Sequence, residues 1–229
     1  MSDAATGVWA VLVAAGRGER LAGDRPKAFA NLAGRPLLAE SLERLESSDW
    51  VEAIVVVAPE GWEEPAILLA EEIGAGKVRA AVTGGATRSD SVRAGVADVP
   101  PDAVVVLVHD AARPLLPDNV VERVVTGLEP GWDGVVPALL LADTVKRAEG
   151  EAVGATVDRT GLSAVQTPQA FVAETFRRAL GAGGDATDCA GLVEGAGGRV
   201  RLVPGDRRLV KVTSPEDLAF VELLLRAER

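Results

Sequence analysis

The chain has 229 residues, of which 48% are hydrophobic, and its 24 basic and 34 acidic residues give a formal net charge of −10. A surface this acidic excludes a general nucleic-acid-binding face, which requires a basic surface. A single cysteine and a single histidine exclude a disulfide framework and a cysteine–histidine zinc site. With no apolar run near the roughly 20 residues of a membrane span and no secretory signal pattern, we expect a cytoplasmic protein without a membrane partner.

The first half of the chain alternates short β-branched runs with amphipathic helical patterns. This alternation predicts an α/β fold with a mostly parallel sheet covered by helices on both faces, and the length fits a single domain spanning residues 1–229. The predicted strands are Val8–Val13, Ala53–Val57, Val78–Val82 and Val104–Val108. The predicted helices are Pro36–Glu46, Trp62–Glu72, Arg88–Val96 and Asp118–Gly127.

The alternation fails after a strand at Val135–Pro137. Residues 139–165 contain two polar, alternating segments, Thr144–Ala148 and Ala152–Val157, which predict a β-hairpin arm without a core of its own. An isolated hairpin is only marginally stable in water, so we expect this arm to lie against another surface, such as a second subunit. The remaining predicted elements are helices at Ala173–Leu180 and Thr187–Glu194, strands at Val200–Val203 and Leu209–Val212, and a C-terminal helix at Ser214–Ala227.

A cationic, glycine-containing loop directly follows the first predicted strand. Ligands of open α/β sheets bind beyond the carboxyl ends of the strands, and glycines let backbone N–H groups approach an anion. The loop is not a dinucleotide-binding fingerprint, because Leu21 replaces the third glycine, which argues against an oxidoreductase; it is not a Walker A loop either. An ordinary glycine turn with solvated charges is the alternative, which the Pro26-Lys27 pair weakens. The cations of the loop are Arg17, Arg20, Arg25 and Lys27.

The string A-A-G-x-G-x-R…P-K resembles the nucleotidyltransferase loop of sugar-phosphate nucleotidylyltransferases, which have a Rossmann-like fold. Seven further motifs follow in order: GGATRSDSVRAGV, LVHDAARPLL, DTVKR, VDRTGL, QTPQAF, ATD and LVKVTSPEDL. Each motif alone is modest, but the ordered set is specific and spans nearly the whole chain. The set is similar to the 2-C-methyl-D-erythritol 4-phosphate cytidylyltransferase family of non-mevalonate isoprenoid synthesis.

The resemblance implies transfer of a cytidylyl group from CTP to 2-C-methyl-D-erythritol 4-phosphate, giving CDP-methylerythritol and pyrophosphate. The attacking phosphate oxygen is already anionic, so the reaction needs charge neutralisation and positioning rather than a general base. The resemblance also implies Mg²⁺ or another divalent cation, and a homodimer formed through the arm.

The family's site residues carry over to matching positions of this sequence. The implied catalytic residues are Arg20, Lys27 and Lys211. The implied CTP-binding residues are Ala14, Ala15, Gly16, Gly18, Gly84, Gly85, Ser91, Asp110 and Ala111. The implied substrate-binding residues are Asp110, Arg113, Thr144, Arg159, Thr167, Thr187 and Lys211, with Asp110 also implied as the metal contact.

Several of these residues have an alternative structural interpretation. Arg20 can form a surface salt bridge, Ser91 can bond back to its own helical turn, and Thr187 and Asp110 can act as helix caps. Arg88, near a predicted helix start, is interpreted as a capping residue. His109 is interpreted as a strand-end residue that holds the following loop, and not as a catalyst.

Three positions depart from the family pattern beside the implied ligands: Ala28, Cys189 and Leu209. They affect the expected substrate geometry more than the expected reaction class. Two other functions therefore stay open, namely a cytidylyltransferase for another polyol phosphate such as ribitol 5-phosphate and a non-catalytic nucleotide-binding protein. The joint presence of Lys27, Asp110 and Lys211 argues against the second.

Overall fold

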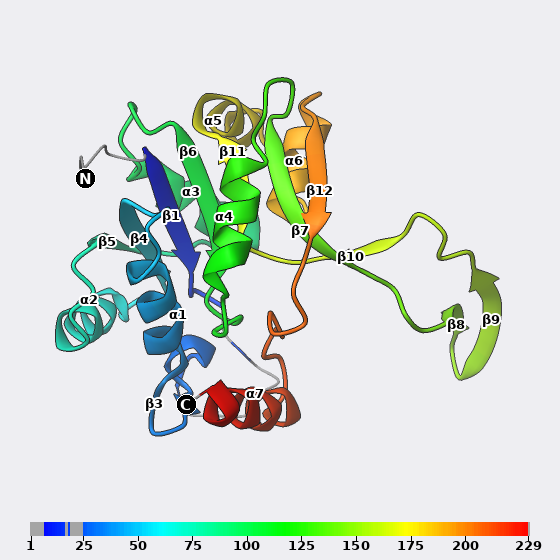
Figure 1. The fold of residues 1–229 in the computed structure, drawn as a ribbon, viewed down its shortest axis with the longest axis horizontal. Helices are drawn as coiled ribbons and strands as arrows, with labels where there is room; N and C mark the ends of the chain where they lie inside the picture. The colour runs from blue at the N-terminus through cyan, green and yellow to red at the C-terminus, as the bar shows by residue number, and fades with distance from the viewer. Residues whose placement is uncertain (1–6, 17, 19–24, 229) are drawn as a thin grey trace.

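The computed structural model describes residues 7–16, 18 and 25–228. Within these residues the chain forms an eight-stranded sheet in the order β10-β7-β11-β6-β1-β4-β5, with β12 also paired to β7 (Figure 1). Its strands are β1 (Val8–Val13), β4 (Ala53–Ala58), β5 (Val78–Thr83), β6 (Val105–Asp110), β7 (Gly134–Leu140), β10 (Ser163–Val165), β11 (Gln169–Val172) and β12 (Val200–Pro204). The helices are α1 (Leu37–Glu46), α2 (Glu63–Glu72), α3 (Arg88–Ala97), α4 (Asp118–Thr126), α5 (Ala173–Gly181), α6 (Cys189–Gly195) and α7 (Pro215–Glu228).

Most neighbouring strands of this sheet run parallel, as predicted. β1 pairs in parallel with β4 and β6, β4 with β5, and β12 with β7. Two short antiparallel strands were not predicted: β11 lies between β6 and β7, and β10 pairs with β7. They flank Pro168, which breaks up the apolar pattern from which strands are predicted.

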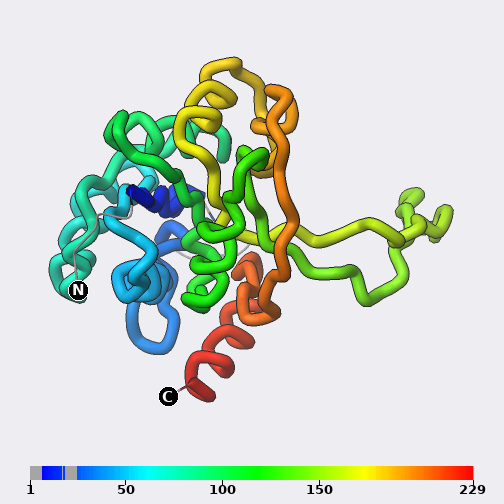
Figure 2. The backbone as a smooth tube through the Cα atoms, turned by 45° about the horizontal axis from the view of Figure 1, so that its top comes forward, coloured from blue at the N-terminus to red at the C-terminus, as the bar shows by residue number. Residues whose placement is uncertain are grey.

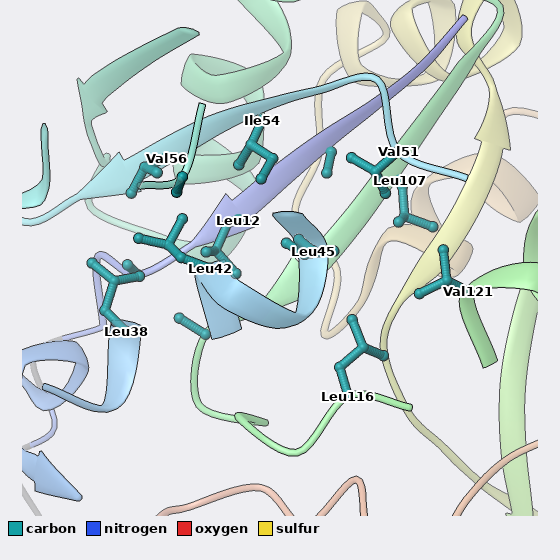
Figure 3. Packing of buried hydrophobic residues seen from close by; sticks show 14 of the residues in the cluster. Leu12, Leu38, Leu42, Leu45, Val51, Ile54, Val56, Leu107, Leu116 and Val121 are labelled. Carbon is teal, nitrogen blue, oxygen red and sulfur yellow. The ribbon is translucent and has the colours of Figure 1, made fainter. Parts of the chain in front are cut away.

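The sheet is buried on both faces because its central strands are apolar throughout. Every residue of β4 and β6 is buried, and successive side chains of a strand point to opposite faces. Leu12 of β1 therefore joins the core cluster under α1, α2 and α4, whereas Val11 joins the cluster under α3, α5 and α6. Figure 3 shows the first cluster, in which Leu38, Leu42 and Leu45 of α1 lie against the strands.

A third, smaller cluster joins the C-terminal helix to the short β2 (Asn31–Leu32) and β3 (Arg35–Pro36) pair. The predicted strand at Leu209–Val212 is wrong, since this segment forms no strand. Its backbone partners lie in the loop after β6 instead: the Val212 N–H donates to the Ala112 carbonyl, and the Leu209 carbonyl accepts from Arg113. The segment thus ties α7 to the end of β6.

The predicted arm leaves the body of the molecule as β8 (Val145–Glu149) and β9 (Ala152–Val157) (Figures 1 and 2). Its two ends return to the sheet where Leu140 of β7 pairs with Ser163 of β10. Leu140 and Val153 carry exposed apolar side chains on the arm. A role of residues 139–165 in dimerisation stays a prediction, as does the single domain. Of the helices described, none is both long and apolar enough to cross a lipid bilayer.

We predict that Phe176→Ala lowers the free energy of unfolding by about 3–5 kcal/mol, because it removes a fully buried ring from the core. The Phe176 ring stacks on that of Phe171, with their centroids 4.4 Å apart, and both side chains are fully buried. Denaturant unfolding measures the change. Phe220→Ala is the matched control, since Phe220 is 50% exposed; equal losses in the two variants would contradict this assignment of the core.

Candidate active site

The candidate site lies at the carboxyl ends of β1 and β6. In their parallel register Val13 pairs with Asp110, so the loops that follow the two strands start side by side. A cavity of about 260 Å³ opens there, between these loops and the start of α3. Its lining residues are Val13, Ala14, Ala15, Gly16, Lys27, Ala28, Gly85, Ala86, Thr87, Arg88, Ser91, Asp110, Ala111, Ala112 and Lys211.

A second, more polar cavity of about 630 Å³ lies between the ends of β6 and β11, the strand β12 and the start of α6. Its lining residues are Arg88, Asp110, Arg113, Val136, Ser163, Val165, Gln166, Thr167, Gln169, Thr187, Asp188, Ala190, Glu194, Val200, Leu202 and Lys211. Of the residues that the structure describes, three line both cavities: Arg88, Asp110 and Lys211. The two cavities therefore meet at one group of charges.

Asp110 is the centre of this group. Its Oδ1 accepts hydrogen bonds from Nη2 and Nε of Arg88 at 2.9 and 3.2 Å, and its Oδ2 lies 2.9 Å from Nζ of Lys211. Burial alone would raise the pKa of Asp110, but the two cations outweigh burial and hold that pKa well below its usual range. Asp110 is thus a carboxylate with both oxygens engaged, and the alternative interpretation as a helix cap is wrong.

His109 and Thr167 form a buried layer behind Asp110. The Thr167 hydroxyl accepts from the Asp110 N–H at 3.1 Å and lies 3.1 Å from Nδ1 of His109, while Nε2 of His109 lies 3.0 Å from the Arg113 carbonyl. The set is satisfied when Thr167 donates to Nδ1 and Nε2–H donates to Arg113. Burial lowers the pKa of His109 to about 4, so the ring is neutral and holds the loop, as predicted.

Gly85 and Ser91 line one side of the first cavity, and Gly84 lies directly behind the neighbouring loop residue Ala15. The Gly85 N–H donates to Oγ of Ser91 at 3.1 Å, and that hydroxyl donates to the Thr87 carbonyl at 3.0 Å. Ser91 thus bonds to its own helical turn, as the alternative interpretation held, and also fixes the glycine segment. A Cβ atom on Gly84 would collide with the Ala15 side chain, so only glycine lets these two loops approach so closely.

Gly18 brings the opening loop against Lys27. Its φ of +67° is in the left-handed region, and a Cβ added there would lie 2.5 Å from Cβ of Lys27. Both the conformation and the contact therefore call for glycine at this position. Lys27 itself lines the first cavity. The predicted catalytic residue Arg20 lies outside the described residues.

Arg113 has the environment of an anion-binding side chain. Its Nη1 donates to the Leu209 carbonyl at 2.5 Å, and its buried Nε has no hydrogen-bond partner among the residues described. Burial is the main reason that the pKa of Arg113 is lowered. Because the side chain lines the second cavity, an anion bound there would supply the missing acceptor.

Two predicted substrate-binding residues lie apart from both cavities, on the arm. Thr144 and Arg159 are exposed, and Arg159 donates to the carbonyls of Leu141, Ala142 and Asp143 in its own chain. Within one chain, the described structure therefore does not bring these two side chains to the site.

Thr187 is exposed and lines the second cavity. Its alternative interpretation as a helix cap is wrong, because Asp188 is the residue that caps α6.

Arg88 is the functional candidate that the sequence analysis missed. It was interpreted as a capping residue, but the cap of α3 is Thr87, which forms a reciprocal capping box with Asp90. That T-x-x-D pattern was the available signal: it makes Arg88 the first helical residue, at the end of the helix that faces the site.

Known relatives of the chain show its family. The family model of 2-C-methyl-D-erythritol 4-phosphate cytidylyltransferase matches residues 8–227. The chain belongs to this family. A cytidylyltransferase of that name from Saccharopolyspora erythraea is 47% identical, covering 95% of this chain and 99% of its own. One from Nocardia farcinica is 45% identical, covering 95% and 94%.

A solved cytidylyltransferase of the family, from Thermus thermophilus, has the same fold. It superposes with a TM-score of 0.78 at 35% identity, covering 94% of this chain and 98% of its own. The family membership and the Rossmann-like fold inferred from the motifs are therefore confirmed. The roles of the individual site residues stay predictions.

We predict that Gly84→Ala weakens CTP binding about tenfold, a loss of about 1.4 kcal/mol, because the displaced glycine segment no longer matches the nucleotide. The strain of the new methyl group should also lower the free energy of unfolding by about 1–3 kcal/mol. The new methyl group would force the glycine segment away from Ala15 and reshape the cavity wall. Calorimetric titration with CTP measures the effect. Gly181→Ala is the control, since a Cβ there meets nothing within 4 Å; similar affinities in the two variants would contradict the role of this wall.

Proposed function

We propose that the chain transfers the cytidylyl group of CTP to the phosphate of 2-C-methyl-D-erythritol 4-phosphate, giving CDP-methylerythritol and pyrophosphate. One observation carries the proposal: in a member of this family, two cavities of different character meet at Arg88, Asp110 and Lys211. Two ligands that occupied these cavities would have their reacting groups at this junction, next to its two cations.

The first cavity is the proposed CTP site. Ala15 and Gly16 are proposed to offer backbone N–H groups to the phosphates, and Lys27 lines the same cavity. Ala14 also lines it, but its N–H donates to the Val57 carbonyl. Gly18, later in the same loop, is proposed to contact the nucleotide as well. Arg20, which follows the loop in sequence, is proposed to act with Lys27 on the triphosphate. The segment Gly84–Gly85 is proposed to read the edge of the cytosine base through its carbonyl groups, because its N–H groups donate to the Ala58 carbonyl and to Oγ of Ser91. Ala111, which also lines the cavity, would lie near the ribose.

The second cavity is the proposed site of the polyol phosphate. Arg113 supplies a buried guanidinium with an unpartnered Nε for the phosphate. The hydroxyl of Thr187 lines the same space and suits a hydroxyl of a polyol. The buried amides of Gln166 and Gln169 are bonded to Asp206 and to Asp188 and Cys189, so they hold the wall of this cavity. Thr167 already bonds Asp110 and His109, so we assign it to holding the site as well as lining it.

The chemistry proposed is an in-line attack by a phosphate oxygen of the acceptor on the α-phosphorus of CTP. The O–P bond forms as the bond to the pyrophosphate oxygen breaks, and pyrophosphate leaves with that electron pair. The attacking oxygen is already anionic, so the reaction needs no general base. The neutral His109 therefore has no proton-transfer role in this mechanism. Catalysis then consists of holding two repelling anions together with Lys27, Lys211 and Arg20.

A divalent cation is proposed to accompany the nucleotide. Among the described residues no group of three or more acidic, histidine or cysteine side chains is arranged to hold a metal. Magnesium sites in phosphoryl transfer commonly combine one or two carboxylates with substrate phosphates and waters. Asp110 would be the protein contact of such an ion through Oδ2 once Lys211 turns away from it, since Arg88 holds only Oδ1. When bound, the ion would neutralise charge on the phosphates.

A homodimer formed through the arm is also proposed. The arm projects from the body of the molecule (Figure 2). It carries exposed apolar residues such as Leu140 and Val153, and exposed apolar surface of this kind often marks a protein interface. In such a dimer Thr144 and Arg159 would complete the polyol site of the partner subunit. This placement would account for their distance from the cavities of their own chain.

We predict release of pyrophosphate when CTP and Mg²⁺ are supplied with 2-C-methyl-D-erythritol 4-phosphate, and no release without an acceptor. The assay is run in parallel with ribitol 5-phosphate. Release of pyrophosphate with ribitol 5-phosphate and not with 2-C-methyl-D-erythritol 4-phosphate would support the proposed cytidylyl transfer but contradict the proposed acceptor. Binding of CTP with no release for either acceptor would contradict the proposal and favour a nucleotide-binding protein.

We predict that Lys27→Ala lowers kcat/KM by about a hundredfold or more while leaving the fold intact, because it removes a charge directed at the reacting phosphates. Steady-state kinetics with both substrates, together with thermal unfolding, measure the two effects. Lys77→Ala is the control: the Lys77 ammonium donates to the Ser48 carbonyl and lines neither cavity. A Lys27→Ala enzyme as active as this control would remove Lys27 from the mechanism.

A further inference from the structure

Of the three described side chains that line both cavities, Arg88 is the one that comes from α3. It is the first residue of the helix, directly after the Thr87 cap. From there its guanidinium extends to Asp110, 22 positions along the chain, and to Sγ of Cys189, which lies 3.3 Å from Nη1. Arg88 thus connects α3, β6 and α6 at the wall between the cavities.

The two cations on Asp110 are held very differently. Arg88 uses Nε and Nη2 on Oδ1 of Asp110 and Nη1 on Cys189, and 23% of its side chain is exposed. Lys211 makes one contact to Oδ2, comes from a segment without regular secondary structure, and has 41% of its side chain exposed. Arg88 is therefore fixed, whereas Lys211 is free to turn towards a ligand in either cavity.

Such a turn has an electrostatic cost that Arg88 offsets. Only 9% of the Asp110 side chain is exposed, and a buried carboxylate left without a counter-charge is strongly unfavourable. If Lys211 were the only cation on Asp110, an incoming phosphate would have to compete with Asp110 for the ammonium. With Arg88 in place the carboxylate stays compensated, and Lys211 is available to the phosphate.

We propose that Arg88 is a positioning residue that carries the counter-charge of Asp110, so that Lys211 can serve the phosphates of the bound substrates. This inference rests on the proposed function. Arginine suits the task because its planar fork binds one carboxylate oxygen with two N–H groups and leaves the other oxygen to Lys211. A lysine would restore the charge but not the fork.

A purely structural role, in which Arg88 only joins α3 to α6, makes different predictions. Arg93 serves as the matched control because it lies on the same helix, pairs with Asp90 and donates to the Leu180 carbonyl, yet lines neither cavity. Its side chain is 29% exposed, close to the value for Arg88. If the role is structural, Arg88→Gln and Arg93→Gln will lose stability alike and activity alike.

The decisive experiment compares Arg88→Gln, Arg88→Lys and Arg93→Gln in steady-state kinetics and in CTP titration, with thermal unfolding of each variant. We expect Arg88→Gln to lower kcat/KM by about a hundredfold, a loss typical of one charge-directed contact, and to weaken CTP binding. Arg88→Lys should recover part of both losses. Arg93→Gln should leave both near wild type. If Arg88→Gln fails to fold, the comparison of Arg88→Lys with Arg93→Gln decides.

A double variant tests the proposed route through Asp110. Asp110→Asn alone removes a site carboxylate and is expected to impair activity, but it also releases Lys211. The Arg88→Gln loss should therefore be much smaller in the Asp110→Asn background than in the wild type, which is a departure from additivity. Equal losses in the two backgrounds would overturn the proposal.

The two levels of proposal fail in distinguishable ways. A wild-type chain that binds CTP but shows no turnover would contradict the proposed function, and the CTP titrations would still test Arg88. A wild-type chain that turns over normally, with Arg88→Gln and Arg93→Gln equally active, would refute the role of Arg88 while leaving the proposed function in place.

Discussion

The parallel pairing of β1 with β6 is the constraint on which the rest of the site depends. The register that sets Val13 opposite Asp110 brings the glycine loop after β1 next to the loop that begins at Asp110. Both strands are held from two sides, since alternate residues belong to different core clusters. The apolar core thus fixes where the two loops begin, and the loops supply the backbone and side-chain groups of the site.

Charge is organised locally in an otherwise acidic molecule. The net charge of −10 would repel nucleotides, so the attraction must come from cations gathered at the carboxyl ends of the central strands. Asp110 looks out of place there, but it orders two of those cations, Arg88 and Lys211, and is itself held by Thr167. A buried ion pair adds little net stability, so its value here is geometric.

Much of the fold followed from the sequence because its signals were local. Short runs rich in valine marked β1, β4, β5 and β6, and the hairpin pattern marked the arm. The strand β11 was missed because four residues beside Pro168 carry no periodicity. Arg88 was missed because its partners, Asp110 and Cys189, are 22 and 101 positions away. Thr144 and Arg159 were predicted at the site through the family resemblance, and within one chain they lie on the arm, apart from both cavities.

The shared wall between the cavities has a thermodynamic consequence. Ligands that contact the same three side chains cannot bind independently, because whichever enters first decides where Lys211 lies for the second. Linkage requires the effect to be reciprocal: if nucleotide alters the affinity for the acceptor by some factor, the acceptor alters the affinity for nucleotide by that same factor. A side chain that turned from a carboxylate to a phosphate would thereby couple the binding of the two substrates without any movement of the sheet.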